Sequence, residues 1–420
     1  MKMANYNKIF VYFDNNIDLK IKVGVIYIEH IKGKEIISFQ FDDSFFKSPL
    51  KNHFFDYDLL PINSRQYVPN HKNNFGCFSD ASPDRWGRTL IKRKARLLFD
   101  SKEKGKAPSL TEIDYLIGVY DEGRMGAIRF SIIENGEYLS NDKEDSTPPF
   151  KFLRTLEQAA IKFEEEQNLF EDKWINILIA PGSSLGGARP KATVKDVDGS
   201  LWIAKFPSKN DSYNSGAWEK TAMDLAKLCS LNTPETKLMK LSKLGSTFLV
   251  KRFDRVNNKR IHFMSAMTAL GKIDGDNASK NVSYLDIASF ISSYGYKPKE
   301  DLKELWKRII FNICISNTDD HLRNHGFILT EKGWELSPIY DINPNIYKDG
   351  LSLNIDSNDN SLSLELAISV SEYFDLEKDE AQNICNQIKN IIIENWEKIA
   401  LANGISKYEI EYMRPAFIKQ

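Results

Sequence analysis

Short apolar segments come first along this chain, and long amphipathic segments come last. Residues 8–42 contain the runs IFVYF, KVGVIYI and IISFQF, whose β-branched and aromatic residues, separated by Asn, Gly and Lys, predict short strands. Two later stripes at helical spacing predict packed helices: Leu302, Leu305, Trp306, Ile309, Ile310 and Ile313, then Ile384, Ile388, Ile392, Trp396 and Ile399. The order is therefore β-rich, then mixed, then mostly helical.

Polar and proline-rich stretches between these segments predict the domain boundaries. The polar, charged stretch SNDKEDSTPP at 140–149 ends in two prolines and predicts a boundary. We expect a β-rich subdomain over 1–145, a mixed α/β lobe over 146–255 and a helical lobe over 256–420. Within the first of these, Ser82 and Pro83 predict a helix start, with Ser82 as the cap.

Composition and charge exclude several classes of protein. The 420 residues are 42% hydrophobic and 27% charged, which excludes whole-chain disorder, a collagen-like repeat and a coiled coil. A net charge of −1 gives no overall field toward nucleic acid or anionic lipid. The four cysteines lie far apart, which excludes a close-spaced zinc site and predicts reduced thiols. With no signal-peptide core and no 18-residue apolar run, we expect a cytoplasmic protein without a membrane segment.

The stretch SNTDDHLRN, beginning at residue 316, carries the most informative chemistry. Asp319 precedes Asn324 by five positions, which is the Asp-to-Asn spacing of the protein-kinase catalytic loop. Phosphoryl transfer needs a carboxylate that accepts or orients the substrate's hydroxyl proton and a nearby oxygen ligand for Mg²⁺. Taken alone the spacing is a weak pattern, because Asn317 and Asp320 also suit a plain turn.

The residues that follow strengthen the interpretation. GFILT, EKG and WELSPIY predict a β-hairpin with a short turn, and its exit carries Asp341. A hairpin returns the chain beside its start, so Asp341 would supply a second hard oxygen ligand for Mg²⁺ bound to ATP phosphates. The spacing of His321 and His325 also occurs in zinc sites, but no third ligand is obvious. Ordering of the loop by His321 is the favoured interpretation.

An upstream segment contains what a nucleotide would need. The Gly-rich stretch at 182–188 allows close backbone approach to phosphates, although a plain hairpin turn is an equal alternative. Lys205 lies in a strand-like run, where a kinase lysine meets the phosphates, and Glu219 follows on a predicted helix over 217–229. A Lys–Glu pair would position the lysine. A surface lysine and a solvated glutamate are the alternatives.

The run STFLVKRFDR at 246–255 predicts a buried strand that ends in a hinge. Phe253 would offer an aromatic face to adenine, and Asp254 would reach the ribose hydroxyls. Equally, Phe253 belongs to the core and Asp254 pairs with Arg252 or Arg255. The sequence leaves both interpretations open.

Taken together, these motifs resemble the HipA family, the serine/threonine-protein kinase toxins of bacterial toxin–antitoxin systems. The resemblance rests on SPDRWGR from residue 82, DYLIGVYDEGRMGAIRF from 114, SSLGGARPK from 183, LVKRFDR from 249, and NTDDHLRN from 317 followed by YDIN from 340. It spans nearly the whole chain. It implies an α+β fold, with a β-rich N-terminal subdomain joined to a bilobal kinase-like fold that has a large helical C-terminal lobe.

The resemblance also implies roles for individual residues. Asp319 would be the catalytic proton acceptor, while Asn324 and Asp341 would bind Mg²⁺. The residues implied to bind ATP are Gly186, Gly187, Ala188, Arg189, Pro190, Lys191, Lys205, Lys251, Arg252, Phe253, Asp254, His321 and Tyr340. A serine of the family that is autophosphorylated to switch the kinase off corresponds to Ser184, with Ser183 beside it. Two positions depart from the family pattern: Arg189-Pro190 replaces the frequent Gln-Glu, and Lys251 replaces a common acidic residue.

The partners follow from the resemblance as well. It implies a helix-turn-helix antitoxin through which the chain would reach DNA indirectly, and a protein substrate such as an aminoacyl-tRNA synthetase. Two other functions remain as alternatives: a kinase acting on a small molecule, and a catalytically silent co-repressor that binds an antitoxin. The presence of Lys205, Asp319, Asn324 and Asp341 together argues against the silent protein, which has no need of all four.

Overall fold

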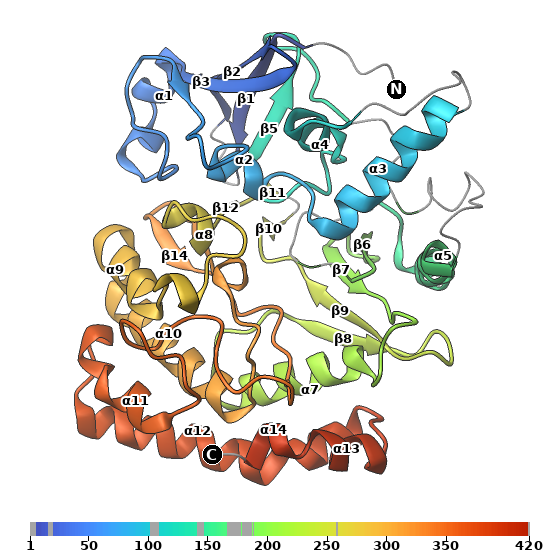
Figure 1. Cartoon of the computed structure of the whole chain (residues 1–420), viewed down its shortest axis with the longest axis vertical. Helices are drawn as coiled ribbons and strands as arrows, with labels where there is room; N and C mark the ends of the chain where they lie inside the picture. The colour runs from blue at the N-terminus through green and yellow to red at the C-terminus, as the bar shows by residue number, and fades with distance from the viewer. Residues whose placement is uncertain are drawn as a thin grey trace. The chain divides into compact units, whose positions relative to one another are not determined.

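The computed structural model describes residues 6–15, 20–100, 109–140, 147–165, 178, 187, 189–257 and 259–418 (Figure 1). The chain forms two compact units. The first unit comprises residues 1–209 and 254–264, and the second comprises residues 210–253 and 265–420.

The first unit is built on an antiparallel five-stranded sheet of order β4-β3-β2-β1-β5 (Figure 1). Its strands are β1 (Lys8–Asp14), β2 (Lys20–Ile31), β3 (Lys34–Phe41), β4 (Gln66–Tyr67) and β5 (Ile128–Ser131). The strands predicted over 8–42 are confirmed. Phe39 and Phe41 lie edge-on to one another, with ring centroids 5.0 Å apart, and Phe41 stacks on Phe45 at 4.2 Å. This aromatic cluster forms the core beside the sheet.

Helices and two short hairpins complete the first unit. The helices are α1 (Asp43–Lys47), α2 (Gly76–Asp80), α3 (Arg85–Asp100), α4 (Glu112–Gly118) and α5 (Leu153–Glu165), with the 3₁₀ segments η1 (Pro49–Asn52) and η3 (Phe150–Phe152). The hairpin strands are β6 (Lys191–Lys195) with β7 (Leu201–Lys205), and β10 (Arg255–Val256) with β11 (Lys259–Arg260). Strand β12 (His262–Ser265) lies where the chain enters the second unit.

The predicted cap of the helix after residue 82 is wrong. Helix α3 begins at Arg85, and the backbone N–H of Gly87 donates to Asp84 Oδ1 at 2.8 Å, which makes Asp84 the cap. Ser82 instead donates from its hydroxyl back to the carbonyl of Phe78 at 2.7 Å. Both residue types suit a cap, and tertiary packing selected the aspartate.

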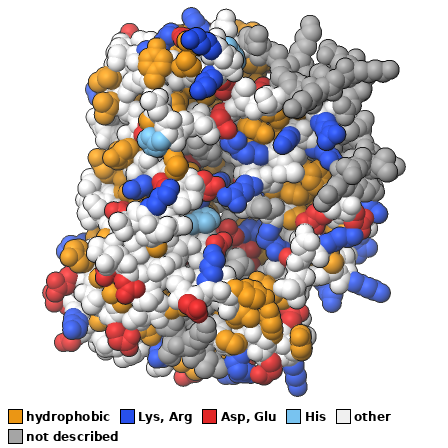
Figure 2. Space-filling model, viewed as in Figure 1, with side chains coloured by type: hydrophobic (Ala, Val, Ile, Leu, Met, Phe, Trp, Pro, Cys, Tyr) orange, Lys and Arg blue, Asp and Glu red, His pale blue; other side chains and the backbone are white. Residues whose placement is uncertain are grey.

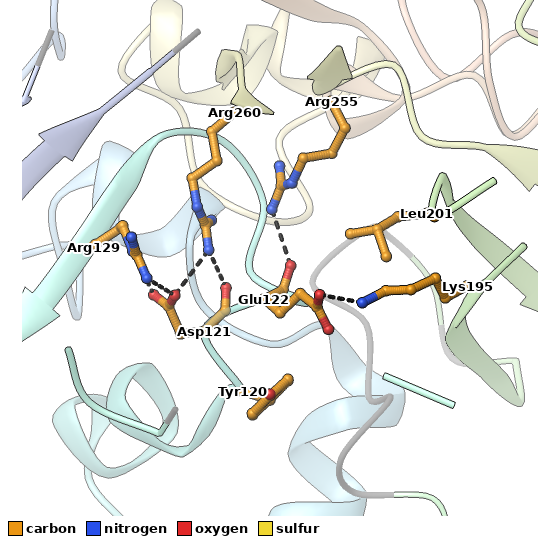
Figure 3. A pocket seen from close by; sticks show the side chains of 9 residues that line it. Tyr120, Asp121, Glu122, Arg129, Lys195, Leu201, Arg255 and Arg260 are labelled. Carbon is orange, nitrogen blue, oxygen red and sulfur yellow. Dashed lines mark hydrogen bonds and ion pairs between the residues drawn. The ribbon is translucent and has the colours of Figure 1, made fainter. Parts of the chain in front are cut away.

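A network of arginines and carboxylates holds residues 254–264 to the rest of the first unit (Figure 3). Arg260 donates to Asp121 Oδ2 at 3.0 Å, and Arg255 donates to the carbonyl of Glu122 at 3.1 Å. The network lines a pocket of about 440 Å³ formed by Tyr120, Asp121, Glu122, Arg129, Lys195, Gly199, Leu201, Arg255 and Arg260. Each lysine or arginine of this pocket has a carboxylate partner, so we interpret the network as structural.

The second unit is mostly helical. Its helices are α7 (Ser215–Leu228), α8 (Ala266–Ala269), α9 (Tyr284–Tyr294), α10 (Pro298–Cys314), α11 (Leu364–Ser369), α12 (Lys378–Ala402), α13 (Lys407–Met413) and α14 (Pro415–Ile418), with the 3₁₀ segments η4 (Ala278–Lys280), η5 (Leu322–Asn324) and η6 (Ser371–Phe374). Two hairpins accompany them: β8 (Thr236–Met239) with β9 (Thr247–Lys251), and β13 (Gly326–Leu329) with β14 (Trp334–Leu336). The hairpin predicted after the Asp319–Asn324 stretch is therefore confirmed.

Helix α12 packs against α7 and α10 and closes the core of this unit (Figure 1). Phe417 of α14 stacks on Trp396 of α12 with ring centroids 4.4 Å apart, and its ring centroid lies 6.0 Å from that of Trp218 in α7. The predicted apolar stripe of α10 is buried along its length, as a helix at the centre of a packed unit requires. The predicted α+β class is confirmed.

Asp301 joins the first turn of α10 to β14 and makes the second unit sensitive to pH. Its Oδ2 accepts from the backbone N–H of Leu336 at 2.9 Å, and burial raises the pKa of Asp301 to about 6. Between an unfolded pKa of about 3.9 and this value, the folded state holds a proton that the unfolded state releases, so stability falls as pH rises.

We expect Asp301→Asn to abolish this dependence of stability on pH. From about pH 4 to about pH 6 the melting temperature of the wild type should fall relative to that of the variant. Above about pH 7 the difference between the two melting temperatures should stay constant. Scanning fluorimetry across this range measures it, with the exposed Asp375→Asn as the control. Parallel melting profiles for wild type and Asp301→Asn would contradict the assignment.

Candidate active site

Asp319 presents its carboxylate to solvent from the loop between α10 and β13. Its side chain is 68% exposed, and Lys348 Nζ lies 3.3 Å from Asp319 Oδ1. The lysine side chain is itself 53% exposed, and an ion pair between exposed groups contributes little to stability. The arrangement therefore leaves the Asp319 carboxylate accessible to a substrate.

The neighbouring Asp320 points the opposite way and is buried. It accepts hydrogen bonds from Tyr284 Oη at 2.7 Å, Asn312 Nδ2 at 2.8 Å and His325 Nε2 at 2.7 Å. Burial alone would raise the pKa of Asp320, but the charge of His325 and the hydrogen bonds from His325 and Tyr284 outweigh it and lower the pKa. Asp320 is thus an ionised residue that holds the loop to the interior, and the adjacent Asp319 faces solvent.

Further hydrogen bonds fix the loop on both sides of Asp319. Asn317 Nδ2 donates to Asn312 Oδ1 at 3.0 Å, and Asn317 Oδ1 accepts from the backbone N–H of Asn343 at 3.2 Å. Ser352 Oγ donates to the carbonyl of Thr318 at 2.9 Å. The sequence left a plain turn open for Asn317 and Asp320, and the structure shows that both tie the loop to its surroundings.

Asn324 and Asp341 offer oxygen atoms of the kind that Mg²⁺ prefers. Asn324 Nδ2 donates to the carbonyl of Asp319 at 3.0 Å, while Asn324 Oδ1 is buried and has no hydrogen-bond partner among the described residues. Asp341 adopts φ +58°, a left-handed conformation that is uncommon outside glycine and often marks functional sites. A buried amide oxygen without a partner, on the same unit as a carboxylate, fits a hard cation.

Two aromatic rings predicted to flank the nucleotide lie side by side in the second unit. The rings of Phe253 and Tyr340 have centroids 5.5 Å apart, and Phe253 is half-buried. Tyr340 Oη donates to the carbonyl of Arg323 at 2.8 Å, which places this ring next to the residue preceding Asn324. His321 is also half-buried, and its Nδ1 has no partner within the described ranges.

The predicted phosphate-contacting residues of the first unit are described only in part. Ser183, Ser184, Gly186 and Ala188 lie outside the described residues. Gly187 is exposed with φ +102°, which suits a turn. Arg189 is half-buried, Pro190 is buried, and Lys205 ends β7 half-buried. Lys191 is buried, with its ammonium bound to Asp84.

The remaining predicted residues lie in or next to regular elements. In the second unit, Lys251 pairs with Glu235 at 3.2 Å on the surface, while Arg252 and Glu219 are buried. In the first unit, Asp254 is fully buried and accepts from Arg255 at 2.5 Å and from the backbone N–H of Gly126 at 2.9 Å. The ion pair with Arg255 was one of the two interpretations that the sequence left open.

Sequence reasoning missed the residues that support the loop from a distance. Tyr284 and Asn312 hold Asp320 from α9 and α10, and nothing in their local sequence distinguishes them from core residues. Lys348 follows Asp341 by seven positions, and its nearness to that predicted metal ligand was the signal available.

No group of three or more His, Cys, Asp and Glu side chains gathers as a metal cluster in the part of the chain that the structure describes, and His325 binds Asp320 instead. Within the same ranges, no helix combines the length and the apolar character needed to span a membrane. On the face shown in Figure 2, lysines and arginines lie among aspartates and glutamates.

Comparison with known proteins identifies the family. Residues 183–396, slightly more than half of the chain, match the model of the HipA-like C-terminal domain. The chain belongs to the HipA family. Its fold is similar to that of HipA from Shewanella oneidensis, solved as a complex of a toxin–antitoxin system with HipB and operator DNA. That likeness has a TM-score of 0.65 and 16% identity and covers 96% of this chain and 94% of the other, so it shows the shared fold.

Curated relatives match over shorter stretches. A Haemophilus influenzae protein called "Putative kinase" is 32% identical over 135 residues, which are 29% of this chain and 39% of the relative. The Sinorhizobium fredii "Putative kinase Y4dM" is 27% identical over 158 residues, or 34% of this chain and 37% of the relative. The chain thus matches less than half the length of these relatives.

Proposed function

We propose that this chain is an ATP- and Mg²⁺-dependent serine/threonine-protein kinase. The observation that carries the proposal is the contrast within one loop, where Asp320 is buried under three hydrogen bonds and Asp319 is exposed. A loop anchored in this way holds one carboxylate at a fixed place in solvent, which positioning a hydroxyl nucleophile requires. Membership of the HipA family supports the same function.

In this proposal different residues of the second unit accept the proton, bind Mg²⁺ and contact the adenine ring. Asp319 orients the substrate hydroxyl and accepts its proton as the oxygen attacks the γ-phosphorus of ATP and the bond to ADP breaks. Asn324 and Asp341 would hold Mg²⁺, which neutralises charge on the phosphates when bound. Phe253 and Tyr340 would contact the adenine ring, with His321 nearby.

Lys205 and Gly187 are also proposed to contact the phosphates, Gly187 through its backbone. Lys251, Arg252, Asp254 and Glu219 remain proposed contributors to the nucleotide site. Ser184, with Ser183, remains a proposed site of autophosphorylation.

We further propose that the kinase is a cytoplasmic toxin that works with a helix-turn-helix antitoxin. The Shewanella HipA was solved with HipB and operator DNA, and a comparable partner would bring this chain to DNA indirectly. The near-neutral net charge supports indirect contact, because binding DNA alone usually needs a basic surface. The proposed substrate is a translation component such as an aminoacyl-tRNA synthetase.

Transfer of labelled phosphate from ATP, with and without Mg²⁺ and a candidate protein substrate, tests the proposal. We expect Mg²⁺-dependent transfer to protein, and Asp341→Ala should weaken Mg²⁺-dependent ATP binding about tenfold or more in calorimetry, because a carboxylate ligand is lost. Turnover only with small molecules would favour the small-molecule kinase, and ATP binding without any transfer would favour the silent co-repressor. Unchanged affinity in Asp341→Ala would remove that residue from the metal site.

A further inference from the structure

The motif SPDRWGR forms one side of a buried ion pair in the first unit. Asp84 Oδ2 accepts from Lys191 Nζ at 2.9 Å, and the two side chains are 0% and 2% exposed. The same carboxylate caps α3 through its other oxygen, and Trp86 Nε1 donates to the carbonyl of Lys191 at 3.0 Å. Asp84 therefore binds the side-chain ammonium of Lys191, and Trp86 binds its backbone carbonyl.

That lysine lies between two predicted phosphate-contacting features. A Cβ atom added to Gly187 would lie 3.1 Å from Lys191 Nζ, so the ammonium sits directly against Gly187. On the other side, Lys191 is the register partner of Lys205 across β6 and β7. Directly opposite residues of an antiparallel pair project from the same face, so these two lysines share one face of the hairpin.

Two like charges placed opposite each other are unfavourable unless one is compensated. The Asp84 carboxylate compensates the charge of Lys191, which lies opposite Lys205 in the hairpin. A buried lysine bound to a carboxylate is also restrained, unlike a surface lysine with its many rotamers. The ammonium of Lys191 is thus engaged by the protein rather than offered to a ligand.

We propose that Asp84 is a positioning residue of the nucleotide site, which acts through Lys191 to hold Gly187 in place and to balance the charge opposite Lys205. This inference rests on the proposed function and deepens it, because it assigns the SPDRWGR motif a part in ATP binding. It also gives Lys191 a supporting role in place of the direct phosphate contact expected from the sequence.

The test separates positioning from stability. Asp84→Asn keeps an oxygen that can cap α3 but removes the negative charge that Lys191 meets at this position, and we expect both a lower melting temperature and about tenfold weaker ATP binding. The double variant Asp84→Asn/Lys191→Met removes both charges, and we expect it to recover melting temperature while ATP binding stays about tenfold weaker. Calorimetry with ATP and scanning fluorimetry supply the two readouts.

A matched control is available in the same unit. Lys72 and Asp58 form another shielded pair, 2.5 Å apart with side chains 5% and 8% exposed. Asp58→Asn should lower the melting temperature without weakening ATP binding. If the Asp84→Asn/Lys191→Met double variant binds ATP like the wild type, the pair is only structural and the inference fails. If the wild type itself does not bind ATP, the proposed function fails instead.

Discussion

Replacing Asp319 with asparagine should reduce phosphoryl transfer by about 100- to 10,000-fold and leave ATP binding nearly unchanged. The substitution keeps the size of the side chain but removes the group that accepts the hydroxyl proton, and a general base contributes a factor of this size. Little loss of stability is expected, because the side chain is 68% exposed and its ion pair with Lys348 lies at the surface. Single-turnover transfer from labelled ATP and calorimetry give the rate and the affinity.

Asp375→Asn is the matched control for this prediction. Asp375 is also an exposed aspartate with a lysine nearby, since its Oδ2 lies 3.8 Å from Lys299 Nζ and its side chain is 54% exposed. We expect this variant to transfer phosphate at the wild-type rate. Transfer at the wild-type rate by Asp319→Asn would show that another group accepts the proton.

Asp320→Ala should destabilise the second unit by about 3–5 kcal/mol, the usual effect of removing one member of a buried charged network. The truncation leaves Tyr284, Asn312 and His325 with donors that no longer reach a carboxylate. Because a domain is typically stable by only about 5–15 kcal/mol, the melting temperature should fall steeply. Scanning fluorimetry of the purified chain measures the shift.

Tyr284→Phe provides the milder companion variant should Asp320→Ala fail to fold. It removes one of the three donors and should lower stability by about 1–3 kcal/mol, because a hydrogen bond to a charged group is lost. Since the pKa of Asp320 is lowered, its contribution is complete above the unfolded-state value and is lost only as the pH falls through the lower folded value. An unchanged melting temperature in both variants at neutral pH would contradict the anchoring role.

Much of the fold could be predicted because local patterns decide local structure. The strands over 8–42, the amphipathic stripe of α10 and the β13–β14 hairpin each follow from the periodicity of apolar residues or from turn residues within a few positions. The helix start near residue 82 shows the limit of this reasoning. Ser82 and Asp84 are equally good caps by type, and only the packing of α3 decided between them.

Part of the candidate site could likewise be predicted from the sequence, and part depends on tertiary packing. The sequence by itself determined the Asp319-to-Asn324 spacing, the hairpin that follows and the position of Asp341, because these lie within one continuous stretch. It did not determine which of two adjacent aspartates is exposed. Tyr284 and Asn312 decide that by burying Asp320, and they come from helices that only tertiary packing brings to the loop.

The pairing of Asp84 with Lys191 belongs wholly to the tertiary structure. The two residues are 107 positions apart, and neither of their segments indicates by itself that they meet. Periodicity and turn chemistry carry information over a few residues, whereas a buried ion pair depends on which elements the folded core brings together. The sequence thus determined the chemical groups of this protein, and the three-dimensional packing decided which of them face solvent and which hold the others in place.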